Sequence, residues 1–432
     1  MKQGNLPNNI TQKGFFRRLA LLIAMFSLLA TAGFAQPTYP FPQNYKYPYG
    51  QIYTAAGTTV QTTIQGLYNS WKSTYYAEGT IGGVACGRIK FIQPGQSGAL
   101  TVSEGIAYGM LIFVYMDNTS NSTQDEFNKL WAYYQKNSNG NGVMNWKVDG
   151  FTGNVAAGTG NANGATDADI DVATALLLAH KQWGSAGAVN YLTAAKTLIN
   201  QIYMTEVDGN KLLKPGDAFN DYANPSYYIT NATTLFGKVE VAQGWQASDR
   251  WAAVTQACYN IMKTARNGTS GLVPDWCNTP SGSSISGIIS DKFESYYLYD
   301  AIRIPWRMAE AYAWYGHADA KDIASKSTAW AIANYNDPAS IWDGYLLPGQ
   351  VFNNPTGNAN FTNLGKNHNP CFSGGLSIGS MVDPAASGFT TYMGKCWTIG
   401  SANDPYGAYF TNTTQLLYML CLTWWLGVLV AI

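Results

Sequence analysis

The chain has 432 residues, of which 46% are hydrophobic and only 12% are charged, about half the usual charged share. Lys and Arg number 26, and so do Asp and Glu, which argues against a nucleic-acid-binding protein and against polybasic membrane contact. Aromatic residues make up 14%, with 29 Tyr and 14 Trp. Such a composition suits either a large aromatic core or a surface that binds an uncharged ligand with flat apolar faces, such as a sugar chain.

The N-terminal segment has the pattern of an export signal. A basic region ending at Arg18 precedes an apolar run from Leu19 to Thr31, and residues 33–35 (Gly-Phe-Ala) form a small-x-small cleavage site. The apolar run is short for a membrane span. We therefore expect a signal peptide over residues 1–35, a secreted or periplasmic protein, and a single domain over residues 36–432.

Cysteine and histidine do not suggest a metal site. The six Cys residues are irregularly spaced without a CxxC pair, which predicts neither zinc binding nor a disulfide framework. In an exported protein they could form disulfides, or they could stay buried as free thiols. The three His residues, His180, His317 and His368, are far apart in the chain. We expect no metal and no cofactor.

Apolar residues recur with helical periodicity along most of the chain, in segments separated by loops rich in Gly, Asn and Ser, whereas strand-like alternation is rare. The sequence therefore predicts an all-α domain. The predicted helices lie near Thr59–Tyr75, Glu104–Met116, Gln124–Lys136, Val172–Trp183, Ala186–Met204, Tyr227–Phe236, Asp249–Thr264, Asp300–Trp314, Ala318–Tyr335 and Thr414–Leu426.

Three carboxylates, Asp167, Asp169 and Asp171, stand at alternate positions directly before the apolar run that begins at Val172. One Asp could simply cap the helix, because an acidic group in a first turn interacts favourably with the helix dipole. Three exceed what a cap requires, and buried charge is costly without a partner or a use. We expect this cluster to face a polar cavity.

Other polar and aromatic residues also stand just before predicted helices. If alternate helices of a closed helical barrel point the same way, such residues collect at one mouth of the barrel, where a cleft would lie. The residues in question are Glu104, Trp146, Asp167, Asp217, Phe219, Tyr227, Asp275, Trp276 and Asp300.

Two of these acids have informative neighbours. Glu104 could merely interact with the helix dipole or could serve chemistry, and Gly105 and Gly109 would let another backbone or a ligand approach the same helix closely. Asp300 precedes Arg303 by three residues, so an ion pair is the simplest interpretation. The alternative is an acid held ionised by Arg303 beside aromatic side chains that pack on a sugar.

Six strings together point to a known family: TVSEGIAYGM from Thr101, ATDADIDVA from Ala165, LKPGD from Leu213, NPSYY from Asn224, GLVPDWC from Gly271, and YDAIRIPWR from Tyr299. In this order and spacing they resemble glycoside hydrolase family 8, and its bacterial endo-β-1,4-glucanases in particular. The resemblance implies an (α/α)6 barrel and inverting hydrolysis of β-1,4-linked polysaccharides or oligosaccharides. We expect a monomer without membrane contact.

The resemblance also implies roles for single residues. Glu104 resembles the general acid, and Asp300 resembles the base that activates water. Asp167 resembles the carboxylate that contacts the sugar at the cleavage point. Tyr227 and Arg303 resemble neighbours that position the water and the base. The expected substrate-binding residues are Trp146, Phe219, Tyr227, Tyr299 and Arg303, with Phe219 standing where the family has a stacking Trp.

Some alternatives remain open at this stage. Xylan and chitosan are alternative substrates, since the family includes enzymes for both. Another class is a non-catalytic polysaccharide-binding protein, or a structural partner in polysaccharide export, although the presence of all three carboxylates favours an enzyme. The uncharged segment Leu416–Ile432 is about as long as a minimal membrane span, but Tyr418, Thr423 and Gly427 favour the last buried barrel helix.

Overall fold

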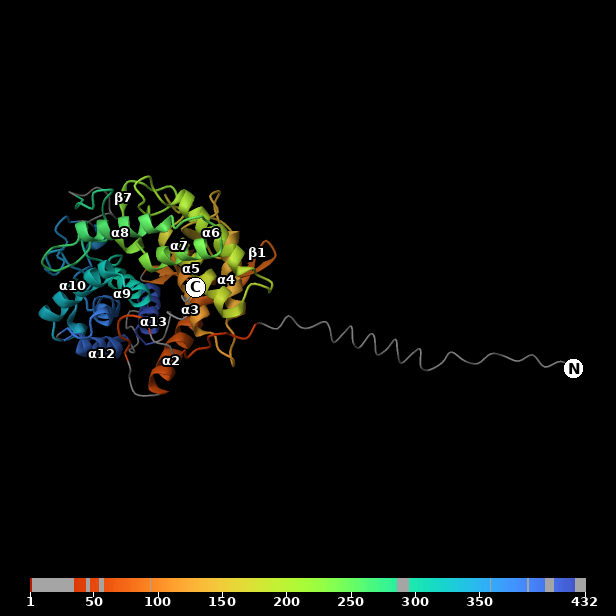
Figure 1. Ribbon diagram of the computed structural model, residues 1–432, viewed down its shortest axis with the longest axis horizontal. Coiled ribbons are helices and arrows are strands. Elements are labelled where there is room, and N and C mark those ends of the chain that lie inside the picture. The colour runs from red at the N-terminus through yellow and green to blue at the C-terminus, as the bar shows by residue number, and fades with distance from the viewer. Residues whose placement is uncertain are drawn as a thin grey trace. The chain divides into compact units, whose positions relative to one another are not determined.

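Helices that are apolar on nearly every side form the inside of the protein, and helices with one apolar face surround them (Figure 1). The computed structural model describes residue 1 and residues 35–43, 47–53, 58–93, 95–285, 295–357, 359–386, 388–400 and 408–423. The predicted signal peptide, apart from its two end residues, and the last nine residues of the chain lie outside this description. Residues Gln36–Ile432 form one compact unit.

Six inner helices form a closed ring, because each packs on the next and the last packs back on the first. In ring order they are α3 (Ser103–Met116), α5 (Thr166–Trp183), α7 (Thr230–Ala242), α9 (Arg303–Tyr315), α11 (Pro370–Ile378) and α13 (Tyr409–Thr423). In α3 every residue except Glu104 is buried. A helix that buries its whole circumference must be surrounded by protein, which is the position of these six.

Six outer helices each pack against the ring. They are α2 (Thr58–Tyr75) on α13, α4 (Gln124–Lys136) on α3, α6 (Tyr191–Thr205) on α5, α8 (Trp251–Ala265) on α7, α10 (Ala318–Asn334) on α9 and α12 (Phe389–Gly400) on α11. They are amphipathic: α4, for example, buries Phe127, Leu130 and Tyr134 and exposes Gln135 and Lys136. The two rings confirm the predicted all-α fold and the (α/α)6 barrel.

Several elements differ from the sequence-based prediction. Helices α11 and α12 were not predicted, and the described residues also contain four two-stranded antiparallel sheets. These pair β1 (Tyr76–Ile81) with β2 (Val84–Ile89), β3 (Ile92–Gln93) with β4 (Gln96–Ser97), β5 (Leu100–Val102) with β6 (Lys147–Asp149), and β7 (Tyr222–Ala223) with β8 (Cys277–Asn278). The sheets lie in the loops that connect the helices.

The predicted helix starts need correction at three places that matter for the site. Helix α5 begins at Thr166, so Asp167 and its neighbouring acids lie within the first two turns rather than before the helix. No side chain caps this helix, whose N-cap position is Ala165. Helix α9 begins at Arg303, which leaves Asp300 in the preceding turn, and Tyr227 lies in a short 3₁₀ helix (Pro225–Tyr227) before α7.

Close backbone packing explains the glycine spacing in α3. A Cβ atom on Gly109 would lie 2.7 Å from Leu130 Cδ1 and 2.9 Å from Ile89 Cγ1. A Cβ atom on Gly105 would lie 3.2 Å from the Tyr409 hydroxyl. The two glycines therefore let α4, β2 and α13 approach α3, so their role is in packing rather than in ligand access.

All six cysteines lie in the described residues as buried thiols, and none of them forms a disulfide. Among the described residues no helix is both long enough and apolar enough to cross a membrane. The part of the apolar tail up to Thr423 belongs to α13 and is buried in the ring, as expected for a last barrel helix. The remainder of that tail, including Gly427, lies outside the described residues.

Candidate active site

A cleft of about 1190 Å³ lies at the end of the barrel where the inner helices begin. Residues at or just before the starts of all six inner helices line it, which agrees with the arrangement expected from the sequence. In ring order these are Glu104, Asp167, Tyr227, Asp300, Asn369 and Phe410. The positive ends of several helix dipoles therefore point toward this cleft, which favours negative charge there.

The structure brings most of the predicted site residues together. The cleft is lined by Glu104, Trp146, Asp167, Phe219, Tyr227, Tyr299 and Asp300, and also by Trp276. Two of the helix-start acids are not on its surface. Asp217 accepts hydrogen bonds from the side chains of Asn139 and Asn141 and from the Gly164 amide, all at 2.8 Å, and so holds a loop of the wall.

Asp275 supports the turn that carries Asp300. Its Oδ1 accepts hydrogen bonds from the backbone amides of Leu298 at 2.9 Å and Ala301 at 2.7 Å. Burial, with a contribution from the nearby Asp300, raises the pKa of Asp275 well above its ordinary value. The Asp275 carboxyl therefore acts on the turn that carries Asp300 through the backbone amides.

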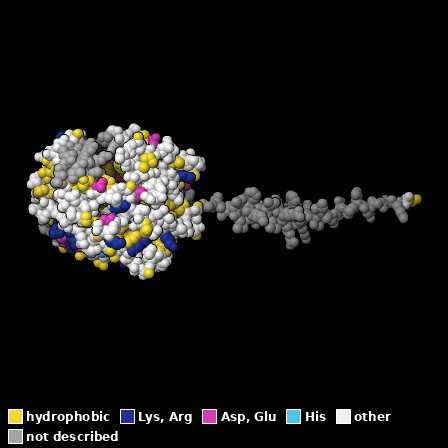
Figure 2. Space-filling model, turned by 90° about the horizontal axis from the view of Figure 1, so that it is seen from above, with side chains coloured by type: hydrophobic (Ala, Val, Ile, Leu, Met, Phe, Trp, Pro, Cys, Tyr) yellow, Lys and Arg dark blue, Asp and Glu magenta, His cyan; other side chains and the backbone are white. Residues whose placement is uncertain are grey.

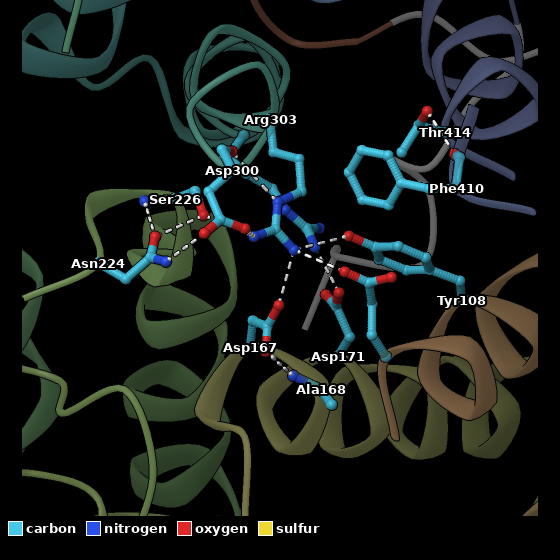
Figure 3. A network of polar contacts seen from close by, with 12 residues as sticks. Tyr108, Asp167, Ala168, Asp171, Asn224, Ser226, Asp300, Arg303, Phe410 and Thr414 are labelled. Atoms are coloured by element: carbon cyan, nitrogen blue, oxygen red, sulfur yellow. Dashed lines mark hydrogen bonds and ion pairs between the residues drawn. The ribbon is translucent and has the colours of Figure 1, made fainter. Parts of the chain in front are cut away.

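Arg303 is not on the cleft surface, which corrects its prediction as a substrate-binding residue. Its side chain is only 1% exposed and lies beneath the cleft, where it contacts all three predicted catalytic carboxylates. Nη1 donates to Glu104 Oε2 and to Asp167 Oδ2, both at 2.8 Å, and Nη2 donates to Asp300 Oδ1 at 2.7 Å. Figure 3 shows its guanidinium between Asp167 and Asp300. A buried arginine must be paired, and these acids meet that requirement.

Glu104 is placed in the first turn of α3 by the antiparallel pairing of β5 with β6 just before it. The Ser103 amide donates to the Trp146 carbonyl at 2.8 Å, which also places Trp146 at the cleft. Glu104 Oε1 accepts a hydrogen bond from the Tyr409 hydroxyl at 3.0 Å. Burial raises the pKa of Glu104 to about 7, although Arg303 lowers it; the charge of Asp167 adds to the increase.

Only one of the three alternate acids faces the cleft, because residues four apart share a helix face and residues two apart do not. Asp167 contacts Arg303 and accepts from the Ala168 amide at 2.9 Å, and burial raises its pKa. Asp171 lies one turn deeper and pairs with Arg307. Asp169 points elsewhere and accepts from the Tyr134 hydroxyl at 2.5 Å. The expected cluster facing one cavity is therefore a single carboxylate.

Asp300 is the most accessible of the three contacting acids, with its side chain 32% exposed against 16% for Glu104 and 4% for Asp167. Its Oδ2 accepts from Asn224 Nδ2 at 3.0 Å, while Oδ1 accepts from Arg303. Asn224 is oriented by Ser226, whose hydroxyl donates to Asn224 Oδ1 at 2.7 Å. Both oxygens of Asp300 thus act as acceptors, and the group remains open to solvent.

The walls of the cleft are aromatic. Phe219 lies edge-on to Trp276 with ring centroids 5.9 Å apart, and Tyr227 is 6.4 Å from the same Trp276 ring. Trp276 is carried by the loop just before β8, which pairs with β7. Sequence reasoning placed Trp276 at the mouth but assigned it no binding role. The remaining aromatic residues of the wall, Phe91 and Phe410, had no signal in the sequence.

No group of three or more His, Cys, Asp or Glu side chains in the described part of the chain could hold a metal ion. The carboxylates that converge at the cleft share Arg303 as their counter-charge.

Comparison with known proteins identifies the family. The family model described as "Glycosyl hydrolases family 8" matches residues 39–346. The chain belongs to family 8 of the glycosyl hydrolases. It is therefore a glycoside hydrolase. The matched residues include Glu104, Asp167 and Asp300, whereas Asn369, Tyr409 and Phe410 come from the part of the chain beyond it.

Relatives and solved structures agree with this family 8 assignment. "Endoglucanase 2" of Ruminiclostridium josui is 33% identical over 412 residues, which cover 93% of this chain and 81% of the relative. The apo structure of a beta-1,3-1,4-glucanase from Paenibacillus sp. X4 matches with a TM-score of 0.76 and 28% identity, over 90% of this chain and 99% of that one. A cold-adapted family 8 xylanase with bound substrate shares the fold, with a TM-score of 0.69 and 19% identity over 91% of this chain and 97% of that one.

Proposed function

We propose that this family 8 protein is an inverting, endo-acting hydrolase of β-1,4-linked glucan, with Glu104 as general acid and Asp300 as general base. The observation that carries the proposal is the single guanidinium of Arg303, which contacts both carboxyl groups through different nitrogens. The two acids therefore stand apart at one cleft, in environments that differ in burial. An inverting glycosidase requires two such carboxyl groups, roughly 6.5–9.5 Å apart, with room for a water between them.

Glu104 is suited to protonate the leaving oxygen. Because its pKa is raised to about 7, a large fraction of the enzyme holds this proton at neutral pH and below. The Tyr409 hydroxyl and Arg303 hold one oxygen each, which fixes the direction of the carboxyl group. A fixed acid donates along one line, toward a glycosidic oxygen bound across the cleft.

Asp300 is suited to activate water. Its two oxygens accept from Arg303 and Asn224, and the third of its surface that remains exposed gives water access to it. Tyr227, whose ring lies 5.4 Å from the Arg303 guanidinium, lines the cleft between these groups and the aromatic wall. The proton removed from water passes to Asp300, while Glu104 gives its proton to the departing sugar.

Asp167 is placed to stabilise the sugar at the moment of cleavage. The transition state of glycoside hydrolysis resembles an oxocarbenium ion, so positive charge develops at the anomeric carbon. A carboxylate that lines the cleft between the acid and the base stabilises that charge. The contact with Arg303 favours the charged form of Asp167, which burial opposes.

The lining of the cleft favours a neutral sugar chain. Apart from the three proposed catalytic acids, its described lining contains one charged residue, Asp343. The Asp343 carboxylate already accepts from the backbone amides of Lys366 at 2.9 Å and Asn367 at 3.0 Å. Chitosan carries ammonium groups and would need further acidic partners. The face in Figure 2 likewise shows few charged side chains.

Glucan is preferred over xylan because relatives that share about a third of this sequence over 93% or more of the chain are named endoglucanases. The relative named a reducing-end xylose-releasing exo-oligoxylanase is 27% identical over 59% of the chain. The relatives named endoglucanases also support internal cleavage of a long chain. A purely binding role is disfavoured because all three carboxylates converge on one guanidinium.

The proposal is tested by product stereochemistry and by substrate comparison. Proton NMR of fresh products from a β-1,4-linked oligosaccharide should show the α-anomer first, and early appearance of the β-anomer would contradict inversion. Release of reducing ends should be compared side by side on mixed-linkage glucan, carboxymethylcellulose, xylan and chitosan. Faster release from xylan or chitosan than from both glucans would overturn the substrate assignment.

A further inference from the structure

A second ion pair lies directly beneath the catalytic layer. Arg307 Nη2 contacts Asp171 Oδ2, and both side chains are 3% exposed or less. Arg307 follows Arg303 by four residues on α9, and Asp171 follows Asp167 by four residues on α5. The two ion pairs therefore lie one helical turn apart between the same two helices. We call Arg303–Asp167 the upper rung and Arg307–Asp171 the lower rung. Figure 3 shows Asp171 beside the upper rung.

Each rung spans the inside of the barrel. In the ring, α7 stands between α5 and α9 and packs on both of them. The two rungs therefore connect helices that are not neighbours in the ring. A shift of α9 along its axis relative to α5 would change the distance between Arg307 Nη2 and Asp171 Oδ2 and so weaken the lower rung.

Arg307 is held in place on other sides as well. Its guanidinium lies 3.9 Å from the centroid of the Trp306 ring, and its Nη1 is 4.0 Å from Glu310 Oε2. Glu310 accepts from Trp306 Nε1 at 2.9 Å and from Asn231 Nδ2, on α7, at 3.3 Å. The lower rung is thus tied to the helix that separates α5 from α9.

Stability alone is a weak reason for such a pair. The cost of removing two charges from water often equals or exceeds their attraction, so apolar residues of similar volume can replace a buried ion pair without loss of stability. Neither Asp171 nor Arg307 lines the cleft, so neither touches substrate. A role in catalysis must therefore pass through the upper rung, where Arg303 holds Glu104, Asp167 and Asp300.

We propose that Asp171 and Arg307 are positioning residues that set the axial register of α5 against α9, and thereby the distances among the three catalytic carboxylates. This inference rests on the proposed function of the upper layer. A displacement of about 1 Å in a catalytic group is enough to lower a rate by about a hundredfold. The lower rung is one helical turn from the groups it positions, so its loss acts on the chemical step.

The test replaces the rung with apolar residues in the full-length enzyme. Asp171→Leu combined with Arg307→Met should keep the thermal midpoint within a few degrees of wild type, lower kcat about 10- to 100-fold, and leave KM within about threefold. Arg307→Lys keeps the charge without the fork and should retain more of kcat than Arg307→Met. The matched control is Glu240→Gln with Arg250→Met, which removes an ion pair between a buried Glu240 and a partly exposed Arg250 outside the cleft lining, and should leave kcat unchanged.

Each outcome decides the question. A folded double variant with full kcat overturns the proposal, and so does an equal loss of kcat in the control. If the double variant and Arg307→Lys both fail to fold, the pair serves stability and the proposal is also overturned. The proposed function fails separately, if wild-type enzyme releases the β-anomer or hydrolyses no glycan.

Discussion

Arg303 contacts Glu104 at 2.8 Å, although the two residues lie on α9 and α3 at different sides of the ring. From the sequence we expected Arg303 to pair with Asp300 and to help position the water and the base, and we assigned it no contact with Glu104. Arg303 lowers the pKa of Glu104, whereas burial raises it. Burial has the larger effect, since the pKa of Glu104 is raised to about 7. The acid is therefore poised near neutrality rather than locked in its protonated form.

The alkaline limb of the pH profile should report this balance. Glu104 must carry its proton to act, so kcat/KM is expected to fall as pH rises through about 7. The Tyr409 hydroxyl stabilises the ionised form of Glu104, so Tyr409→Phe should raise that pKa and move the limb to higher pH, by up to about one unit. The measurement is kcat/KM on a soluble glucan across pH 4–10.

Tyr418→Phe is the matched control for this shift. Tyr418 lies on the same helix and is buried, but its hydroxyl donates to the Ile302 carbonyl at 3.3 Å. Its removal should leave the alkaline limb in place. If the alkaline limb of the pH profile does not move in Tyr409→Phe, or moves equally in both variants, the role given to Tyr409 is wrong.

The amide variants of the two catalytic carboxyls should differ in rescue. Glu104→Gln and Asp300→Asn should each lower kcat by at least about 10²- to 10⁴-fold, as is usual for general acid–base groups. A substrate with an activated leaving group needs no protonation, so it should restore much of the rate of Glu104→Gln only. Asp217→Asn, which changes a wall residue outside the cleft lining, is the control. Equal rescue of both variants would mean that the roles are wrongly assigned.

Phe219 should form a weaker sugar subsite than Trp would. Its ring lines the cleft and is only partly exposed, with Trp276 behind it at 5.9 Å. A larger ring buries more apolar area against a pyranose face, so Phe219→Trp should lower KM for long oligosaccharides several-fold and leave kcat unchanged. Steady-state kinetics on a ladder of chain lengths would show this. The same KM at every length would refute it.

Asp169 and Glu206 should make the fold sensitive to alkali. Both side chains are buried, and Glu206 Oε1 and Asp169 Oδ2 would lie 3.0 and 3.1 Å from a Cβ atom placed on Gly164. Two buried carboxyl groups so close to one place repel each other when both are ionised, which favours the protonated form of one of them. Burial raises the pKa of Asp169 to about 7 and that of Glu206 well above its ordinary value. The folded state then holds more protons than the unfolded chain above about pH 4, so the free energy of unfolding falls as pH rises through and beyond 7.

Glu206→Gln should remove much of this dependence, because an amide does not titrate. The drop in thermal midpoint between about pH 6 and pH 9 should shrink by a few degrees relative to wild type. Glu126→Gln removes a partly exposed carboxylate that pairs with Lys72, and it should leave the slope unchanged. A steeper slope in Glu206→Gln than in wild type would reject the protonated carboxyl.

The convergence of the sequence strings at one cleft was predictable because their residues lie at helix starts, and helix starts converge in a closed ring. The different orientations of the three acids could also have been predicted once the helix is known to begin at Thr166. Asp167 and Asp171 are four residues apart and share a helix face, whereas Asp169 lies on another face. The helix start at Thr166 was missed because no side chain caps it. The acids instead meet partners across the barrel, which no local pattern reveals.

Other elements could not be predicted for different physical reasons. Helix α11, which was not predicted from the sequence, contains Gly374 and Gly375, and glycine lowers helix propensity. Both are required by packing, since a Cβ on Gly374 would lie 2.8 Å from Tyr418 and one on Gly375 would lie 2.4 Å from the Ile302 carbonyl. Tyr409 contacts Glu104 and Phe410 lines the cleft, both from the last helix of the ring, so their roles depend on closure of the ring.

The contact between Tyr409 and Glu104 joins residues 305 positions apart, on the last and first helices of the inner ring. During synthesis, Glu104, Asp167, Asp300 and Arg303 all precede the segment that closes the barrel. A growing chain therefore contains all the charged groups of the proposed catalytic site before α13, which completes the cleft, has been synthesised. Hydrolytic activity consequently reports completed folding. Proteolytic cleavage of the chain before α13 that releases this helix should abolish activity although every carboxylate is still present. Specific activity should likewise measure the native fraction of a preparation.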